Sequence, residues 1–294
     1  MPTDATTTNG IDLSTLPAPA VLEALSFETI LAEMIAAVQT GVPGVFDGIP
    51  DFDGSIESDP AVKVLQVAAY FRLVDRAKKN EDVKAIMVAY AEGADLTNLG
   101  ALLGVIRLDG EEDEPYRERI VMAPDGFSVA GPEAAYVFHA RSASALVKDA
   151  TAISPSPSEI TVTILSTEGD GTASPELIAI VEAALSAITI RPLTDLVTVQ
   201  SAEIIEYEAN STLYVYDGPD SSVVLANAVA GRDKYINAMR KIGRDVTRSG
   251  LNAAQFVEGT QRVVIADPAA DVVCDDTQAA WCTDRSTVLG GVAE

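Results

Sequence analysis

Residues 159–185 read EITVTILSTEGDGTASPELIAIVEAAL, and this segment contains one strand and one helix joined by a polar loop. Ile160–Ile164 alternates apolar residues with threonine, which is the pattern of a strand with one buried face. Ser174 can cap a helix that has Pro175 in its first turn. The apolar stripe of this helix consists of Leu177, Val181, Ala184, Leu185 and Ile188. A strand followed by such a helix indicates an α+β fold, in which helices cover a sheet.

The same pattern continues on both sides of this segment. Upstream, a helix is predicted over 132–143 and an apolar strand near 146–153, followed by the turn signal SPSPS at 154–158. Downstream, Pro192 bars further helix, and strands are predicted at 196–207 and 210–216. These elements together predict a small sheet covered by helices.

The rest of the C-terminal part is predicted to contain two helices and two strands, over residues 221–240, 249–257, 261–266 and 271–274. The shorter helix leads into an apolar strand and a turn at Asp267-Pro268, as the helix over 132–143 also does. The part of the chain around each of these two helices also contains one further helix and one further strand, which follow in a different order in the two parts. We therefore expect two small two-layer α/β sandwich units of similar build, over residues 111–207 and 208–294, the second with a C-terminal tail.

The N-terminal part predicts helices only. Residues 1–19 are rich in Thr, Pro and Asn and are expected to form an extended or disordered arm. Ser26 can cap a first helix, and residues 41–57, rich in Gly, Pro and Asp, are expected to form a long loop. The apolar stripe of this helix consists of Phe27, Ile30, Leu31, Met34, Ile35 and Val38. Residues 20–110 are thus predicted to be a helical arm that precedes the two sandwich units.

A second helix is predicted from Pro60, with Ser58 or Asp59 as its cap. Residues 61–74 are apolar on nearly all sides, and such a helix must be buried on more than one face. Two interpretations stay open: the helix packs against partner chains in an assembly, or it is the central helix of an ordinary domain.

Shorter helices follow. The charged stretch 75–82 precedes an apolar stripe formed by Val83, Ile86, Met87 and Tyr90. Asp95 can cap a leucine-rich helix that ends at Gly104. The acidic run 109–114 is expected to be a solvated loop or the start of a helix over 115–122.

Composition excludes several classes of function. The chain of 294 residues is 48% hydrophobic, so most of it is expected to fold, and its formal net charge is −24. Such a charge repels nucleic acid and anionic lipid, and it suits partners with basic patches. The sequence contains no run of about 18 apolar residues, so no membrane span is expected. The polar N-terminus lacks the basic region of a secretory signal, which predicts synthesis in a cytoplasm.

The sequence contains few features typical of catalytic or ligand-binding sites. The motifs GxxxxGK[ST], GxSxG, HExxH and CxxC are absent, as is GxGxxG after a strand. Gly169-Asp170-Gly171 precedes a helix, but Asp170 would repel an anion, so a simple turn is favoured. Asp47, Asp51 and Asp53 have acidic spacing that could hold calcium, yet the bidentate Glu of a known calcium loop is missing. We expect no catalytic, cofactor-binding or metal-binding residues.

The four remaining side chains have structural interpretations. His139, the single histidine, is expected to be a packed or hydrogen-bonded structural residue. Cys274 and Cys282 are expected to be free thiols, with a disulfide as the alternative if the protein meets an oxidising exterior. Trp281 could anchor an interface or pack in the local core.

Several phrases of the sequence, in order, resemble the phage baseplate J protein family over about residues 16–285. They are LPAP (16–19), SDPAVK (58–63), AYAEGADLTNLGALLGVIRL (89–108), AGPEAAYVFHA (130–140), VKDATAISPSPSEITVTILSTEGDGT (147–172), RPLTDLVTVQSAEIIEY (191–207), GRDVTRSGL (243–251), TQRVVIADPAADVV (260–273) and TQAAWC (277–282). The longest of them, at 89–108, is the most characteristic. The arm before Leu16 is not part of the resemblance.

The resemblance implies a non-enzymatic wedge subunit of a contractile tail baseplate. Two copies in each wedge, about twelve in all, are expected to form a sixfold ring around the central hub. The N-terminal helices are expected to join a bundle with a companion wedge subunit, and the α+β units to pair between neighbouring wedges. The ring would support the sheath until contraction is triggered. The expected location is the virion tail baseplate, assembled in the cytoplasm of the host bacterium.

Two alternatives remain. The same subunit could serve a headless phage-tail-like particle or another contractile injection system. More remotely, the chain could be an acidic cytosolic α+β enzyme or small-molecule binder, which would require a pocket with convergent polar groups.

Overall fold

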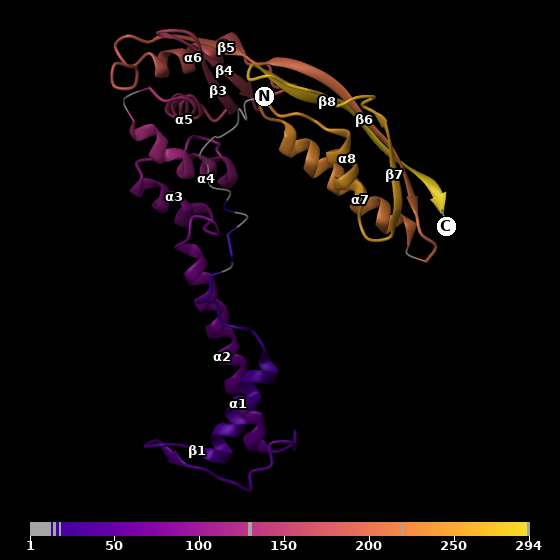
Figure 1. Ribbon diagram of the computed structural model, residues 1–294. Coiled ribbons are helices and arrows are strands. Elements are labelled where there is room, and N and C mark those ends of the chain that lie inside the picture. Colours follow the sequence, from indigo (N-terminus) through magenta and orange to yellow (C-terminus); the bar gives the residue numbers. More distant parts are fainter. Residues whose placement is uncertain (1–12, 14–15, 18, 129–130, 219, 293–294) are drawn as a thin grey trace. The chain divides into compact units, whose positions relative to one another are not determined.

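The computed structural model describes residues 13, 16–17, 19–128, 131–218 and 220–292. Most of the N-terminal arm predicted over residues 1–19 lies outside them. The chain forms two compact units, a helical unit within Asp12–Leu102 and a sheet unit within Leu103–Glu294 (Figure 1). No helix in the described part of the chain is both long enough and apolar enough to cross a membrane.

The helical unit contains α1 (Phe27–Thr40), a hairpin of β1 (Gly41–Val42) and β2 (Phe46–Asp47), α2 (Pro60–Ala85) and α3 (Gly93–Leu102). Both predicted helix starts are confirmed. The Ser26 hydroxyl accepts a hydrogen bond from the Thr29 N–H at 3.2 Å. The Asp59 carboxylate accepts one from the Ala61 N–H at 2.7 Å, with Pro60 in the first turn of α2. These side chains satisfy N–H groups that the helix itself leaves unpaired.

One face of α2 is covered by α1 and by the segment before it, which lie alongside α2 in Figure 1. Ile30 of α1 and Val62 and Ala69 of α2 are buried. The Asn80 side chain accepts from the Glu23 N–H at 2.9 Å and donates to the Glu23 carbonyl at 2.8 Å. The α1–α2 pair is therefore held by a small apolar contact and by a polar clamp.

Three details of the helical prediction are wrong. The charged stretch 75–82 does not precede a new helix but lies inside α2, because Lys, Arg and Glu are good helix formers. α2 ends at Ala85, so the apolar stripe predicted beyond it is mostly in turns. α3 begins at Gly93, which places Asp95 in the first turn and not at the cap. Gly104 follows the helix with φ 72°, as predicted for a helix stop.

The first lobe of the sheet unit contains α4 (Asp113–Met122), a 3₁₀ helix η2 (Ala123–Phe127), α5 (Glu133–Ala143), β3 (Val147–Ser156), β4 (Glu159–Ser166), α6 (Pro175–Leu185) and β5 (Leu196–Ser201). The strand order is β3-β4-β5, with β3 antiparallel and β5 parallel to β4. β3 runs through part of the predicted turn at 154–158 and ends at Ser156.

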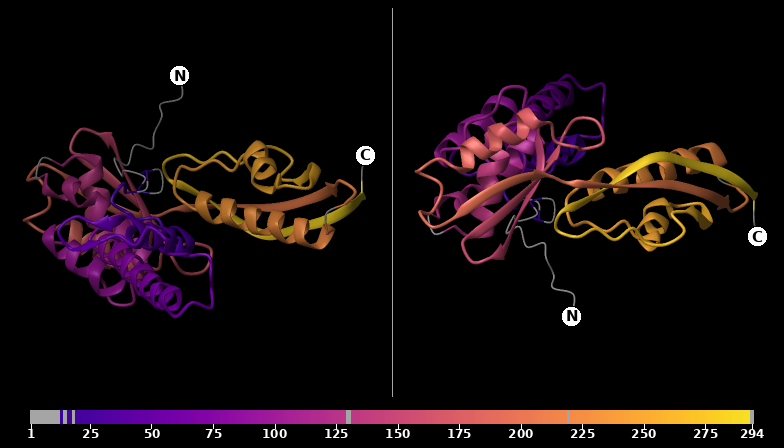
Figure 2. Two further views of the ribbon diagram at one scale, coloured as in Figure 1. Left: turned by 90° about the horizontal axis from the view of Figure 1, so that it is seen from below. Right: turned by 90° about the horizontal axis from the view of Figure 1, so that it is seen from above.

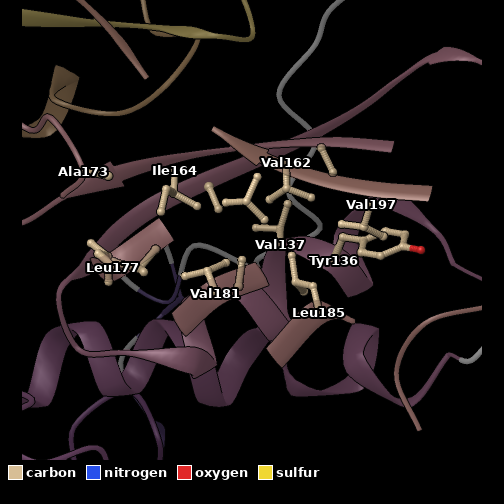
Figure 3. Close-up of a cluster of buried hydrophobic side chains, with 14 of the residues drawn as sticks. Tyr136, Val137, Val162, Ile164, Ala173, Leu177, Val181, Leu185 and Val197 are labelled. Carbon is tan, nitrogen blue, oxygen red and sulfur yellow. The ribbon is translucent and has the colours of Figure 1, made fainter. Parts of the chain in front are cut away.

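The core of this lobe lies between the sheet and the helices α5 and α6. Figure 3 shows Val162 and Ile164 of β4 pointing toward Val181 and Leu185 of α6. The predicted strand and the Ser174 cap of α6 are confirmed, the cap with a 3.2 Å bond from the Leu177 N–H. Ile188 is the exception, because α6 ends at Leu185 and Ile188 is 89% exposed.

The second lobe contains β6 (Glu203–Val215), α7 (Ser221–Met239), α8 (Arg248–Gln255), β7 (Thr260–Asp267) and β8 (Gln278–Val292). Its strand order is β7-β6-β8, with β7 antiparallel and β8 parallel to β6. In Figure 2 the strands are nearer in the view from above and α7 is nearer in the view from below, so this helix lies on one face of the sheet. Each lobe thus has a central strand with one antiparallel and one parallel neighbour, and the predicted similar build, in permuted order, is confirmed.

Several strand predictions in this lobe are wrong. The strand predicted over 196–207 is divided between β5 and the start of β6. β6 is continuous through the gap predicted between 207 and 210, because Glu208 and Ala209 pair with Asp284 and Arg285 of β8. Residues 271–274 form no strand, only an isolated bridge from Val272 to Val246. The predicted C-terminal tail is in fact β8, a strand of 15 residues. The boundary proposed between residues 207 and 208 lies inside β6, and the division into domains stays a prediction.

Hydrogen bonds and a small apolar cluster connect the two lobes of the sheet unit. The Asp149 carboxylate accepts from the Ile242 N–H at 2.9 Å, and the Thr151 hydroxyl donates to the Asp276 carbonyl at 2.6 Å. A small apolar cluster at this junction consists of Leu165, Ala202, Ile204, Ile242 and Ala279.

Candidate functional site

His139 occupies a structural setting on α5. Its ring packs edge-on against Phe138, with the ring centres 5.3 Å apart. Partial burial lowers the pKa of His139, and a hydrogen bond to the Gly126 backbone acts in the opposite direction. These contacts favour the interpretation of a packed, hydrogen-bonded histidine.

The acidic candidates engage their own loops. Asp170 accepts a hydrogen bond from the Thr172 N–H at 2.9 Å, which is the geometry of a simple turn. Asp53 accepts from both the N–H and the hydroxyl of Ser55, at 2.9 and 2.6 Å, and these bonds lower its pKa. Across the described residues, no group of three or more His, Cys, Asp or Glu side chains is placed to hold a metal ion.

The C-terminal candidates lie in or near β8. Cys274 is buried and Cys282 half-buried, and both are free thiols. Burial raises the pKa of Cys274 to about 11, which keeps this thiol protonated and unreactive. Trp281 is half-buried, and the Arg240 guanidinium lies 4.3 Å from the centre of its ring. One face of the tryptophan is therefore occupied by a contact within the chain.

A buried ion pair was missed by the sequence reasoning. The side chains of Glu111 and Arg119 are 3% and 4% exposed, and two Arg119 nitrogens donate to the two Glu111 oxygens at 2.7 Å each. Arg119 also donates to the Ile106 carbonyl at 2.8 Å and to the Ser142 hydroxyl at 3.1 Å. The prediction of a solvated loop is therefore wrong for Glu111, because its partner lies eight residues away and no helical or strand spacing signals the pair.

Tyr116 completes this network. It is fully buried, and its hydroxyl donates to the Val105 carbonyl at 2.8 Å. The guanidinium groups of Arg107 and Arg119 lie 4.5 and 5.6 Å from the centre of its ring. The network fixes the segment at the start of the sheet unit against α4 and α5.

A second buried polar network holds β8 in place. The Ser211 hydroxyl lies 2.6 Å from the Gln255 side-chain oxygen and 2.9 Å from the Thr287 hydroxyl. Thr287 also donates to Gln255 at 3.0 Å and accepts from Arg232 at 2.9 Å. Residues of β6, β8, α7 and α8 thus share one set of hydrogen bonds, which fixes the register of β8 on β6.

The strongest candidate surface is an exposed apolar stripe on α2. We define the α2 stripe as Val64, Val67, Phe71 and Val74, which are 67%, 57%, 61% and 44% exposed. The spacing of three, four and three residues is that of a coiled-coil seam. The stripe lies on the side of the helix opposite to the buried Val62 and Ala69, and the described residues of the helical unit leave it exposed.

Exposed apolar side chains in such a row are typical of a binding surface. Full burial of one Val or Phe side chain contributes about 1.5–3 kcal/mol before the costs of association are subtracted. Of the two interpretations offered for residues 61–74, the geometry favours a helix that packs against partner chains.

Comparisons with known proteins agree with this geometry. A family model described as "Baseplate J-like N-terminal domain" matches residues 57–112, and one described as "Baseplate J-like central domain" matches residues 128–201. "Baseplate protein J" of Escherichia phage P2 is 43% identical over 299 residues, which cover 97% of this chain and 99% of the relative. The first family match contains the α2 stripe, and the second contains the core of the first lobe.

Proposed function

Because this chain belongs to the baseplate J family, we propose that it is a structural, non-enzymatic subunit of a phage tail baseplate. More specifically, it builds the wedges of a contractile tail. The observation that carries this proposal is the α2 stripe, which gives the chain an uncovered helical seam. The phage relative supports a tail of a phage over the alternative of a headless particle.

In the proposed assembly, α2 packs into a helical bundle with a companion wedge subunit. α1 already covers one side of α2, and the spacing of the stripe suits a second helix on the other side. A helix that is apolar on nearly all sides is then buried by the assembly and not by its own domain.

The sheet unit forms the ring around the central hub in this proposed assembly. Two copies of the chain in each wedge, about twelve in the baseplate, contact neighbouring wedges and the central hub. The two buried polar networks favour one fixed arrangement of each lobe, which suits a ring that must support the sheath and respond to the contraction trigger. The subunit is made in the host cytoplasm and resides in the tail baseplate of the virion.

The test compares Phe71→Ala with Arg72→Ala in the full chain. Both residues are exposed on α2, but Arg72 lies one position further round the helix, outside the stripe. Truncating an interface anchor costs about 2 kcal/mol or more of binding, or roughly thirtyfold in affinity. We expect Phe71→Ala to reduce co-purification with the other baseplate proteins, and Arg72→Ala to leave it unchanged.

Circular dichroism of both variants checks that the helices are intact. If Phe71→Ala folds and still assembles into baseplates with unchanged yield, α2 is not the bundle helix. If labelled chain is absent from the baseplates of purified tails, the whole proposal fails.

A further inference from the structure

The connection between α1 and α2 carries exposed apolar side chains at one end of the helical unit (Figure 1). We call this connection, residues 41–59, the tip. Its exposed large apolar residues are Val45, Phe46, Ile49 and Ile56, which are 75%, 43%, 57% and 48% exposed. Several such side chains within twelve residues are typical of a surface that contacts another protein.

The tip is held against the end of α1. The Ile49 N–H donates to the Val38 carbonyl at 2.9 Å, and the Gln39 side-chain amide donates to the Phe52 carbonyl at 2.9 Å. A Cβ atom at Gly48 would lie 2.5 Å from the Gln39 carbonyl oxygen, so this close approach requires glycine. The exposed side chains are therefore presented by a preformed loop, which lowers the entropy cost of binding.

The charges of the tip are all acidic. Five acidic residues lie in it: Asp47, Asp51, Asp53, Glu57 and Asp59. It contains no Lys or Arg, and the first basic residue of the chain is Lys63. Asp47 directly follows Phe46, and Glu57 directly follows Ile56. A partner that covers these apolar side chains also takes carboxylates out of water, which is unfavourable unless the partner supplies positive charge.

Charge also indicates which kind of partner fits the tip. Within the helical unit, Arg76 and Lys79 already pair with Glu23, and Arg76 lies 3.4 Å from Glu33. The tips of two copies would repel each other, and nucleic acid or anionic lipid would repel the tip as well. A different protein is favoured, with an apolar patch bordered by Lys or Arg.

We propose that the tip docks on a second protein of the baseplate, in an apolar patch bordered by lysine or arginine side chains. Val45 lies at the turn of the β1–β2 hairpin and would enter this patch, while the acidic residues of the tip pair with the bases around it. The inference rests on the proposed baseplate function and adds a contact to it, because the tip lies outside the α2 stripe.

The test places the photo-crosslinking amino acid p-benzoylphenylalanine at position 45 of the full chain, isolates the tails and identifies the product by mass spectrometry. The matched control carries it at position 86. Ile86 is 71% exposed and lies just beyond the other end of α2, roughly 40 Å along the helix. We expect position 45 to crosslink to one other protein, within a segment in which Lys and Arg outnumber Asp and Glu. Position 86 should give at least tenfold less of this product.

A second arm tests the contribution of charge. The probe at position 45 is combined with Asp47→Asn and Asp51→Asn or, as control, with Glu28→Gln and Glu92→Gln. The control removes the same charge from exposed positions of the helical unit outside the tip. The first pair should reduce the product at least fivefold, because it removes two carboxylates from the contact, and the control should stay within twofold. Circular dichroism of the purified chains checks that both pairs fold alike.

Four results overturn the docking while the proposed function stands. They are a product of two copies of this chain, a product within an acidic segment, an equal loss for both pairs of substitutions, and no product in tails that contain the chain. If the labelled chain is absent from the tails, the proposed function fails and the docking fails with it.

Discussion

Substitution of Glu111 by Gln tests whether the buried ion pair with Arg119 holds the sheet unit together. The change keeps the shape of the side chain and removes its charge. Arg119 would then keep its neutral partners, the Ile106 carbonyl and the Ser142 hydroxyl, but lose its buried counter-charge. Removing one partner of a buried pair costs about 3–5 kcal/mol, and we expect about 3 kcal/mol because the amide oxygen can still accept one hydrogen bond.

The matched control is Glu114→Gln. Glu114 also pairs with an arginine, Arg117, at 3.4 Å, but its side chain is 81% exposed. An exposed pair contributes about 0–1 kcal/mol, so the control should change the free energy of unfolding by less than about 0.5 kcal/mol. The two variants remove the same charge from the same region and differ chiefly in burial.

Urea unfolding followed by tryptophan fluorescence is a suitable assay. The chain has one tryptophan, Trp281, and it lies in the same compact unit as Glu111. Its signal therefore reports this unit and not the helical one. The midpoint for Glu111→Gln should fall with an unchanged dependence on urea, which is the sign of a stability change alone. If the two variants lose equal stability, the buried pair does not stabilise the unit and the reasoning fails.

Three further predictions concern the same unit. Gln255→Leu should lower the free energy of unfolding by about 1–3 kcal/mol, because it removes the acceptor of the buried hydroxyls of Ser211 and Thr287. The prediction is contradicted if urea unfolding shows no larger loss than the same substitution of an exposed glutamine. Burial lowers the pKa of Lys148 to about 8, below the value of about 10.4 in the unfolded chain. Between these two pH values the unfolded chain binds more protons than the folded chain. The free energy of unfolding should therefore rise with pH across that window. Lys148→Met should lack this rise in urea titrations at each pH. His139→Ala should cost about 1 kcal/mol and leave infectivity measurable, whereas loss of infectivity in correctly assembled particles would indicate a chemical role for this histidine.

Helix starts and the first sheet could be predicted because their signals are local. A cap such as Ser26, Asp59 or Ser174 lies within three residues of the N–H group that it binds. The alternation over Ile160–Ile164 likewise shows directly which side chains of β4 face the core.

The missed features depend on partners far away in the sequence. β8 pairs with β6 across about 75 residues, for instance Glu203 with Gln278, and bulges at Thr283 and Gly290 interrupt its alternation. Glu111 and Arg119 are eight residues apart, a spacing that no helix or strand brings together by itself. The composition indicates that many acidic side chains are present, but it does not indicate that Glu111 is the one that is buried.

The chain places its polar and apolar groups in a way that suits assembly. Inside the sheet unit, the hydrogen-bonded networks around Arg119 and Gln255 restrict the packing of the surrounding helices and strands. A shift of one of these elements would leave buried polar atoms unpaired. On the surface, the α2 stripe and the end of β8 are apolar, while the chain as a whole is strongly acidic. A net charge of −24 makes free copies repel one another, so we expect burial of the α2 stripe by a helix of matching spacing to drive association. We therefore expect rigid lobes to be joined at a few specific seams, so that strain at one seam is passed through the lobe to the next and is not absorbed within it.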